Sequence, residues 1–213
     1  WFMTPQTINA YYDPTTNEIC FPAGILQAPF FDPAADDATN YGAIGVVIGH
    51  EMTHGFDDQG SQFDKEGNLR NWWTPQDKAN FKARTERMVR FFDGIEVLPG
   101  LHCNGALTCG ENIADHGGLK VAYQAFRNAT ARNPLPKFEG FTPDQRFFIS
   151  YAQVWANNIR PEALRNQVKT DPHAPGRWRV NGALPQIDAW YNAFGIKKGD
   201  KLFVPKNKRV DVW

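Results

Sequence analysis

The sequence predicts a mainly α-helical domain with a small antiparallel β part, and three observations lead to this fold class. Apolar residues recur at helical spacing in several long segments. Two short strand-like segments near the start of the chain are separated by a run of turn-forming residues. No internal repeat, linker-like stretch or low-complexity segment divides the 213 residues, so we expect one domain.

Each expected element rests on local chemistry. Residues 7–12 and 18–22 are expected to pair as a hairpin, because turn-forming residues lie between them. Thr74-Pro75 and Thr142-Pro143 are typical helix starts, with an N-cap residue followed by proline at the first helical position. Helices are expected over residues 41–56, 74–92, 111–131, 142–155 and 185–194. Loops are expected over residues 32–40, 60–73, 98–110 and 171–183, with a break at Arg160-Pro161 and an irregular tail to Trp213.

Composition and charge exclude several classes of protein. The chain has 23 Lys and Arg against 23 Asp and Glu, so no basic excess points to a nucleic-acid partner. No apolar run reaches the ~18 residues of a membrane-spanning helix, so no transmembrane segment is expected in this chain. Three cysteines are too few for a disulfide scaffold, although Cys103 and Cys109 are close enough in sequence to pair.

Residues 50–54 read His-Glu-Met-Thr-His, an H-E-x-x-H motif. On a helix, His50 and His54 lie on one face, so both imidazoles can bind one ion. Zinc accepts histidine nitrogens and, in catalytic sites, leaves a position for water. Glu51 lies beside the ion, where its carboxylate can take a proton from that water. The apolar segment 43–48 before the motif indicates a buried helix, which an active-site helix requires.

A zinc site with two histidines needs a third protein ligand. The metzincin pattern requires a histidine six residues after the second one, and that position is Gly60. Glu111 and Asp115 fit the gluzincin pattern, because a spacing of four residues puts both carboxylates on one helix face. Glu111 can bind the ion, and Asp115 can accept the second N–H of a ligand histidine. Taken alone, this pair would be an ordinary acidic first turn of a helix. Together with the H-E-x-x-H motif, it indicates a metal site.

Five motifs occur in order along the chain. They are Asn9-Ala10-Tyr11-Tyr12, the segment from Phe21 to Gln27, the segment from Gly49 to Asp58, the segment from Gly110 to Asp115, and the segment from His173 to Val180. Together they resemble the neprilysin and endothelin-converting-enzyme family of zinc metallopeptidases, over a stretch from near Asn9 to Trp213. The resemblance implies a thermolysin-like gluzincin catalytic domain. Residues 1–213 would be its C-terminal part, with several hundred N-terminal residues of the family outside this chain.

The resemblance implies a role for each matching residue. Three residues match the ligands of one zinc ion per chain: His50, His54 and Glu111. Glu51 matches the general base, and Asp115 matches a carboxylate that orients a ligand histidine. Asp57 is a candidate for a second carboxylate of this kind. His173 matches the histidine that stabilises the tetrahedral oxyanion.

The resemblance also implies how a peptide would bind. Asn9 and Ala10 match the pair that hydrogen-bonds a substrate backbone, which agrees with an edge strand over residues 7–12. Arg179 matches the arginine that holds a substrate carbonyl on the primed side. Four residues match the apolar pocket that selects a hydrophobic residue after the cut: Phe30, Val47, Val154 and Trp155. The implied activity is a zinc endopeptidase that cleaves short peptides on the amino side of hydrophobic residues, by Glu-assisted attack of zinc-bound water.

Two departures from the family concern location and completeness. The chain ends Val210-Asp211-Val212-Trp213, where animal members have a cysteine three residues before the final tryptophan. The resemblance therefore favours a bacterial protein in the periplasm, in the cell envelope or secreted, while a cytoplasmic location stays open. The family's second helical domain, which closes over the site, is not in these residues. We expect the N-terminal part to be a partner of this chain.

Two other functions stay open on the sequence. A peptidase remnant could hold peptides without cutting them, although the matching site residues are all present. A deformylase-type zinc amidase also uses H-E-x-x-H and would require Cys109 as a metal ligand. Otherwise Cys109 is expected to be a small buried hydrophobe or a partner of Cys103. His116 lies about 100° around the helix from the face that bears Glu111 and Asp115. It is therefore expected to contact a metal ligand at most and not the metal itself.

Overall fold

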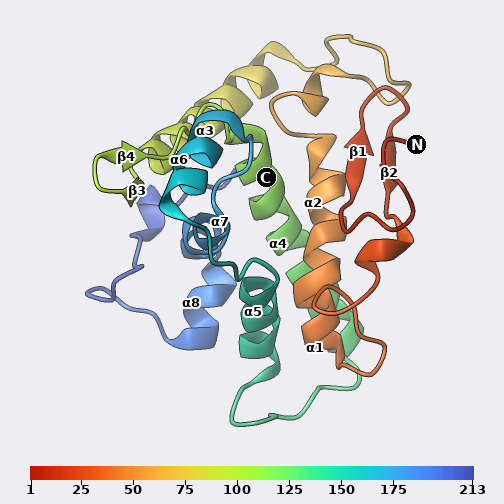
Figure 1. The fold of residues 1–213 in the computed structure, drawn as a ribbon, viewed down its shortest axis with the longest axis vertical. Helices are drawn as coiled ribbons and strands as arrows, with labels where there is room; N and C mark the ends of the chain where they lie inside the picture. Colours follow the sequence, from red (N-terminus) through yellow and green to blue (C-terminus); the bar gives the residue numbers. More distant parts are fainter.

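The computed structural model describes residues 1–213, and its helices pack around a central pair, α2 and α4 (Figure 1). The helices are α1 (Asp37–Asn40), α2 (Val46–His54), α3 (Pro75–Asp93), α4 (Cys109–Thr130), α5 (Pro143–Val154), α6 (Pro161–Thr170), α7 (Gly176–Ala183) and α8 (Asp188–Phe194). The strands are β1 (Tyr11–Asp13), β2 (Glu18–Cys20), β3 (Glu96–Leu98) and β4 (Leu101–His102). They form two antiparallel two-stranded sheets, β1–β2 and β3–β4. The mainly helical fold class with a small antiparallel part is confirmed.

The N-terminal hairpin forms, but its strands are shorter than the sequence predicted. β1 and β2 contain 3 residues each. Asp13 Oδ1 accepts hydrogen bonds from the backbone N (2.9 Å) and the hydroxyl (2.7 Å) of Thr15, which closes the turn. Asn9 and Ala10 lie in the segment that leads into β1 and not inside the strand.

Several expected loops contain regular structure. Residues 32–40 include α1, because Asp36 caps it by accepting from Thr39 N, and residues 98–110 include β4 and part of β3. Arg160-Pro161 follows the end of α5, as expected for a break, but Pro161 also begins α6, a helix that the sequence did not predict. Proline at a first helical position loses no intrahelical hydrogen bond, so it starts a helix as readily as it stops one. Residues 171–183 include α7, which Gly176 begins despite its low helix propensity.

The other expected helices are present with changed limits. α3 and α5 begin where Thr74 and Thr142 cap them, as the sequence predicted. A π-helical turn over residues 41–45 precedes α2, and α4 begins two residues before Glu111. The last helix is divided into a 3₁₀ turn over residues 184–186 and α8. Trp155 is the C-cap of α5, one position beyond its end.

The crossing of α2 and α4 is unusually close because both helices carry a glycine there. A Cβ atom on Gly49 would lie 2.9 Å from Gly118 Cα, and a Cβ on Gly118 would lie 2.7 Å from the backbone N of His50. Real Cβ atoms do not approach other atoms so closely, so any larger residue would push the helices apart. The two glycines therefore bring the H-E-x-x-H helix directly against the helix that bears Glu111 and Asp115.

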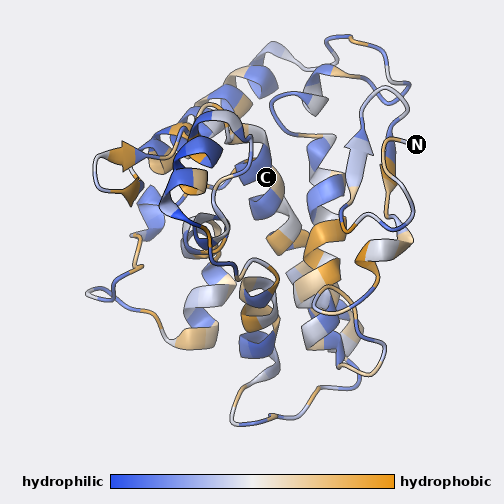
Figure 2. Ribbon diagram, in the orientation of Figure 1, coloured by the Kyte–Doolittle hydropathy of each residue, from blue (hydrophilic) through white to orange (hydrophobic).

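Two apolar clusters hold the remaining helices on this pair. The larger cluster joins α4, α5, α7 and α8, and its fully buried members include Leu119, Phe126, Phe147 and Phe148. The second joins α3 and α4 to the C-terminal tail through residues such as Met88, Ile113 and Val210. Figure 2 shows apolar colour on α2 and α5 and mainly polar colour along α3. None of the helices combines the length and the apolar character that crossing a membrane would need.

Candidate active site

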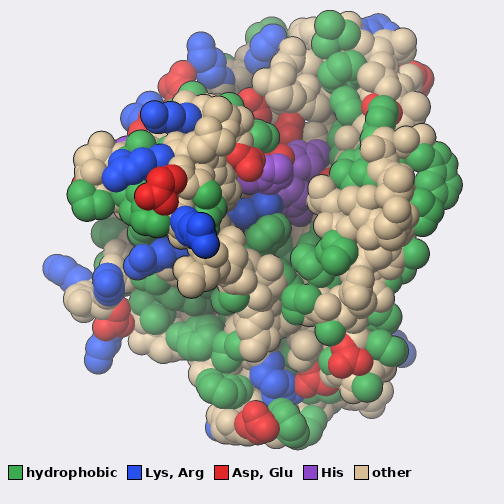
Figure 3. Space-filling view, viewed as in Figure 1, with side chains coloured by type: hydrophobic (Ala, Val, Ile, Leu, Met, Phe, Trp, Pro, Cys, Tyr) green, Lys and Arg blue, Asp and Glu red, His purple; other side chains and the backbone are tan.

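A cavity of about 480 Å³ opens between α2, α4, α5, α7 and the segment before β1. Histidine side chains lie in a hollow near the middle of the face seen in Figure 3, surrounded by acidic and apolar groups. All fourteen site residues that the sequence singled out line this cavity. They are Asn9, Ala10, Phe30, Val47, His50, Glu51, His54, Asp57, Glu111, Asp115, Val154, Trp155, His173 and Arg179. Residues from both ends of the chain therefore meet at one site.

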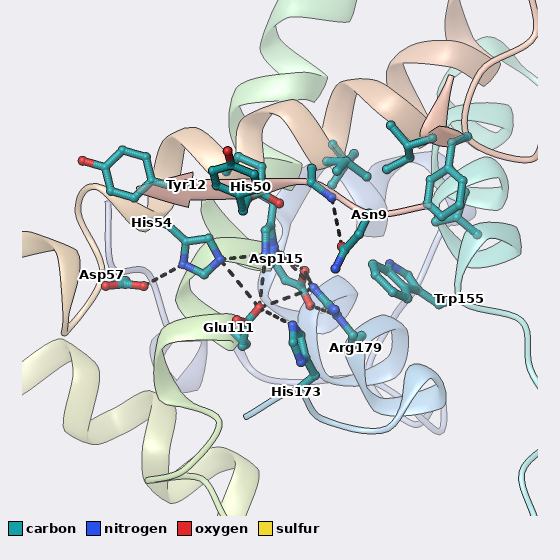
Figure 4. A pocket seen from close by; sticks show the side chains of 18 of the residues that line it. Asn9, Tyr12, His50, His54, Asp57, Glu111, Asp115, Trp155, His173 and Arg179 are labelled. Atoms are coloured by element: carbon teal, nitrogen blue, oxygen red, sulfur yellow. Dashed lines mark hydrogen bonds and ion pairs between the residues drawn. The ribbon is translucent and has the colours of Figure 1, made fainter. Parts of the chain in front are cut away.

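Three of these side chains turn their ligating atoms toward a common point (Figure 4). The Nε2 atoms of His50 and His54 are 3.0 Å apart. Glu111 Oε2 lies 3.1 Å from His50 Nε2 and 3.7 Å from His54 Nε2. These atoms form the only group of His, Cys, Asp and Glu side chains in the chain that is arranged to hold a metal ion.

Two carboxylates behind the histidines set the tautomer of both rings. His50 Nδ1–H donates to Asp115 Oδ1 (2.8 Å), and His54 Nδ1–H donates to Asp57 Oδ2 (2.7 Å). An ionised carboxylate can only accept, so each neutral ring has its proton on Nδ1 and an unshared pair on Nε2. The buried Glu111 Oε2 faces the same point, 3.1 Å from His50 Nε2. With both rings neutral, three electron-pair donors therefore converge, an arrangement that fits a bound cation such as Zn²⁺.

The charges around these ligands shift their pKa values in opposite directions. Burial lowers the pKa of His50, but hydrogen bonds to Asp115 and Glu111 outweigh it and raise the pKa to about 9. Burial raises the pKa of Glu111, yet the hydrogen bond from His50 and the nearby histidine charges lower it to about 2. Without a metal ion, the site therefore favours a proton on His50 and a negative charge on Glu111, and a bound cation would take the place of that proton.

Glu51 and His173 lie beside the ligand group. Burial is the main cause that raises the pKa of Glu51, which brings the carboxylate nearer to the range in which it can accept and return a proton. His173 Nε2 lies 3.2 Å from Glu111 Oε2, and its Nδ1–H donates to Asp171 Oδ1 (2.8 Å). Sequence reasoning missed Asp171, although an acidic residue two positions before a candidate histidine was the available signal.

Arg179 is bound more firmly into the site than a free substrate-binding arginine would be. Its Nε donates to Asp115 Oδ2 (2.8 Å), and its Nη2 donates to Asp115 Oδ1 (2.6 Å). This fork lowers the pKa of Asp115 and raises the pKa of Arg179, although burial acts against both shifts. Asp115 consequently joins Arg179 to His50, a connection that residue spacing could not have revealed.

The two remaining groups of predicted residues are also brought together. Asn9 Oδ1 accepts a hydrogen bond from Ala10 N (2.9 Å), which holds this segment in shape at the rim of the cavity. The four residues assigned to an apolar pocket line one part of the cavity: Phe30, Val47, Val154 and Trp155. Sequence reasoning missed Tyr151, which also lines the cavity, and its spacing of four residues from Trp155 was the available signal.

The cysteine alternatives are wrong. Cys109 does not belong to the metal-ligating group, and burial raises the pKa of its thiol to about 12, so it stays protonated. A protonated thiol is a poor metal ligand. Cys103 and Cys109 are both buried and free, so they do not form a disulfide. Cys109 is a small buried hydrophobe, which was the preferred expectation, and the requirement of a deformylase-type site is not met.

Comparison with known proteins decides the family. The model of Peptidase family M13 matches residues 9–210. The chain belongs to peptidase family M13. This M13 chain is 48% identical, over its whole length, to an endothelin-converting enzyme homolog of Locusta migratoria and to endothelin-converting enzyme 1 of Rattus norvegicus. It covers 29% and 28% of those two proteins, so it spans less than a third of the length of the curated relatives that it matches.

Solved structures share both the fold and the sequence of this M13 chain. The crystal structure of the Mycobacterium tuberculosis zinc metalloprotease Zmp1, in complex with an inhibitor, superposes with a TM-score of 0.97 at 47% identity. That match covers 100% of this chain and 33% of the other. PepO from Lactobacillus rhamnosis superposes with a TM-score of 0.89 at 40% identity, over 100% of this chain and 32% of that protein. The resemblance that the sequence indicated is confirmed, and so is the gluzincin fold.

Proposed function

We propose that this chain carries the catalytic centre of a zinc endopeptidase and hydrolyses peptide bonds. The observation that supports this most directly is the convergence of His50 Nε2, His54 Nε2 and Glu111 Oε2 on one point, with Glu51 lining the same cavity. Two histidines and one carboxylate are the protein ligands of a thermolysin-like zinc site, in which the fourth position is left to water or substrate. We propose one zinc ion per chain, held by these three residues.

A bound zinc ion would supply the Lewis acid that polarises the scissile carbonyl and makes a water molecule more acidic. Glu51 accepts a proton from the attacking water and returns it to the leaving amine, for which its raised pKa suits it. His173 stabilises the developing oxyanion, and Asp171 orients its ring by accepting a hydrogen bond from Nδ1–H (2.8 Å). Asp115 and Asp57 keep the lone pairs of His50 and His54 directed at the ion.

Peptide substrates would lie along the cavity between Asn9 and Trp155. The backbone of Asn9 and Ala10 precedes β1 and offers hydrogen bonds to an extended peptide, while Arg179 binds a carbonyl after the cut. Part of the cavity has an apolar lining, formed by Phe30, Val47, Val154 and Trp155. This lining favours a hydrophobic substrate residue, and the peptide bond on the amino side of that residue would be cut.

The rest of the relatives' length suggests a partner for this chain. We infer that residues 1–213 are the C-terminal part of the M13 catalytic domain and that the N-terminal part packs against them. The relatives are about three times longer than this chain. Large apolar side chains on the outer side of α2 and beyond, among them Ile48, Met52 and Phe56, are exposed here and would be covered by such a part.

Metal content and peptide cleavage together test this function. Elemental mass spectrometry of the purified protein should find about one zinc ion per chain, and a short peptide with an internal phenylalanine should be cut before that residue. Zinc without cleavage would favour an inactive peptide-binding module in place of the enzyme. No zinc in a folded sample that has not met a chelator would contradict the assignment of the ligands for this chain.

A further inference from the structure

The C-terminal end of α5 holds Arg179 from two sides. Tyr151 is fully buried, and its hydroxyl donates a hydrogen bond to the backbone oxygen of Arg179 (2.9 Å). Trp155 follows one helical turn later, and the centre of its ring lies 3.8 Å from Cζ of the Arg179 guanidinium. Residues four apart lie on the same helix face, so one side of α5 contacts both the main chain and the charged group of this arginine.

These contacts add to the restraint that Asp115 places on the Arg179 side chain. The carboxylate of Asp115 binds Nε and Nη2 of Arg179 and fixes the direction of the fork. A planar fork can still hinge about the line that joins its two hydrogen bonds. Stacking on the indole of Trp155 opposes that hinge, because a cation is attracted to the face of an aromatic ring. Nη1 makes no hydrogen bond to a protein acceptor, while Arg179 lines the cavity.

We propose that Tyr151 and Trp155 are positioning residues: Tyr151 fixes the main chain of Arg179, Trp155 sets the plane of its guanidinium, and together they aim Nη1 at a peptide bound in the cavity. This inference rests on the proposed peptidase function. It adds to the pocket-wall role that Trp155 has by resemblance, and it gives a role to Tyr151, which the sequence did not single out. The pair acts through Arg179 and does not itself touch the reacting atoms.

A second arginine in the same molecule supplies a matched control. Arg209 Cζ lies 3.4 Å from the centre of the Tyr191 ring, and the Tyr191 hydroxyl donates to the backbone oxygen of Pro185 (2.9 Å). Tyr191 is nearly fully buried, as Tyr151 is, but it does not line the cavity. Tyr191→Phe therefore removes a buried hydroxyl of the same kind without reaching Arg179.

The first measurements use the zinc-loaded protein and a peptide with an internal phenylalanine. Trp155→Leu should lower kcat/KM about 3- to 30-fold, the range expected for a desolvated cation–π contact. Tyr151→Phe should lower it about 2- to 10-fold, and Tyr191→Phe should change it less than 2-fold. Zinc content should stay at one per chain in all three variants. Equal losses for Tyr151→Phe and Tyr191→Phe would show a general effect on folding and overturn the role of Tyr151.

Repeating Trp155→Leu in an Arg179→Lys background separates positioning from pocket shape. Lysine has no plane to orient. If Trp155 acts through Arg179, its loss should then have less than a 2-fold further effect. A full 3- to 30-fold loss in both backgrounds would mean that Trp155 acts only as a pocket wall, and the proposal would be wrong.

Binding measurements keep this test independent of turnover. The same cycle is run in Glu51→Gln protein, with calorimetry giving Kd for the uncut peptide. The substitutions at Trp155 and Arg179 could prove non-additive in their effects on Kd while the wild-type protein cuts no peptide. That result would contradict the proposed function but not the positioning role. Cleavage by the wild type without coupling in either readout would contradict the positioning role alone. A peptide that neither binds nor is cut would contradict both.

Discussion

The two sides of α2 are the reverse of an ordinary surface helix. The side toward α4 and the cavity carries buried polar residues beside the buried Val46, and both His50 and Glu51 are only 6% exposed. The opposite side is apolar and open: Met52 is 50% exposed and Ile48 is 39% exposed. A surface helix of a globular protein normally directs its apolar side inward and its polar side to water. Under the proposed function, one side serves a metal ion and the other side serves another piece of protein.

The polar side tolerates burial because its histidines have hydrogen-bond partners. His50 and His54 each donate to a carboxylate and turn their free lone pairs toward the metal position. Burying polar groups without partners would cost several kcal/mol, so the carboxylates and the cation are part of what keeps this face folded. The apolar side has no such compensation, and we propose that the part of the protein present in the roughly three times longer relatives covers it.

The largest expected effect comes from Glu51 on the buried side. Glu51→Gln keeps the shape and removes the proton acceptor, so peptide turnover should fall about 10²- to 10⁴-fold. Zinc content, measured by elemental mass spectrometry, should not change, because Glu51 is not one of the three ligands. Glu86→Gln, at an exposed glutamate on α3, is the matched control. Normal turnover in Glu51→Gln would contradict the assignment of the general base.

A second buried histidine sharpens the contrast with His50, because neither ring nitrogen of His116 has a hydrogen-bond partner. Burial, together with the charge of Lys120, lowers the pKa of His116 to about 4, although Asp211 acts the other way. The folded state therefore requires the neutral ring. It should lose up to about 3 kcal/mol of unfolding free energy as the pH falls from 6.5, the ordinary histidine pKa, to 4.

Urea unfolding of wild type and His116→Leu between pH 4 and 7.5 measures this effect. Leucine has no proton to gain, so the variant should show a flatter dependence on pH and a similar stability at pH 7.5. His102→Asn, at an exposed histidine, should follow the wild-type curve. Identical slopes for wild type and His116→Leu would show that His116 is not the group that titrates.

The carboxylate behind His54 should have a smaller effect, on metal affinity. Asp57→Asn removes the charge that orients His54, so the affinity for zinc should fall about 10- to 100-fold. Competition with a fluorescent chelator measures the dissociation constant, and Asp64→Asn, in an exposed turn, serves as the control. If Asp57→Asn binds zinc as tightly as the wild type, the ring of His54 is oriented by its helix alone.

The smallest effect on stability is expected on the exposed side of α2. Met52→Ser should change the unfolding free energy of the 213-residue chain by less than about 0.5 kcal/mol, because Met52 is already half exposed. Self-association of the isolated chain, measured by sedimentation velocity, should nevertheless decrease. A loss of 2 kcal/mol or more would show that this side is packed within the chain and that no covering partner is needed.

Much of the site was readable from local spacing. His50 and His54, and likewise Glu111 and Asp115, are four residues apart, so the helix period alone puts each pair on one face. Reliance on local sequence also explains where the predicted secondary structure was wrong. Pro161 predicts a helix break and Gly176 lies in a predicted loop, but both begin helices, because the first position of a helix does not require the hydrogen bond or the propensity of an interior position.

The connections between distant residues could not be predicted from spacing. The sequence predicts that Asp115 meets one of the ligand histidines, but the spacing does not indicate that this is His50, and it does not indicate the contact with Arg179, 64 positions away. The support that Tyr151 gives to Arg179 depends on the way α5 packs beside α7. Only the packed arrangement of the helices shows which of the candidate side chains share hydrogen bonds.

The sequence by itself indicated the candidate metal ligands and the candidate general base, because the spacing within each motif places the paired side chains on one helix face. The tertiary structure decided that the pair His50 and His54 meets the pair Glu111 and Asp115. Gly49 and Gly118 let the backbones of α2 and α4 touch, and this approach of separate segments depends on packing throughout the domain. It also decided which side of α2 stays open, since exposure is a property of the assembled fold and not of any one segment.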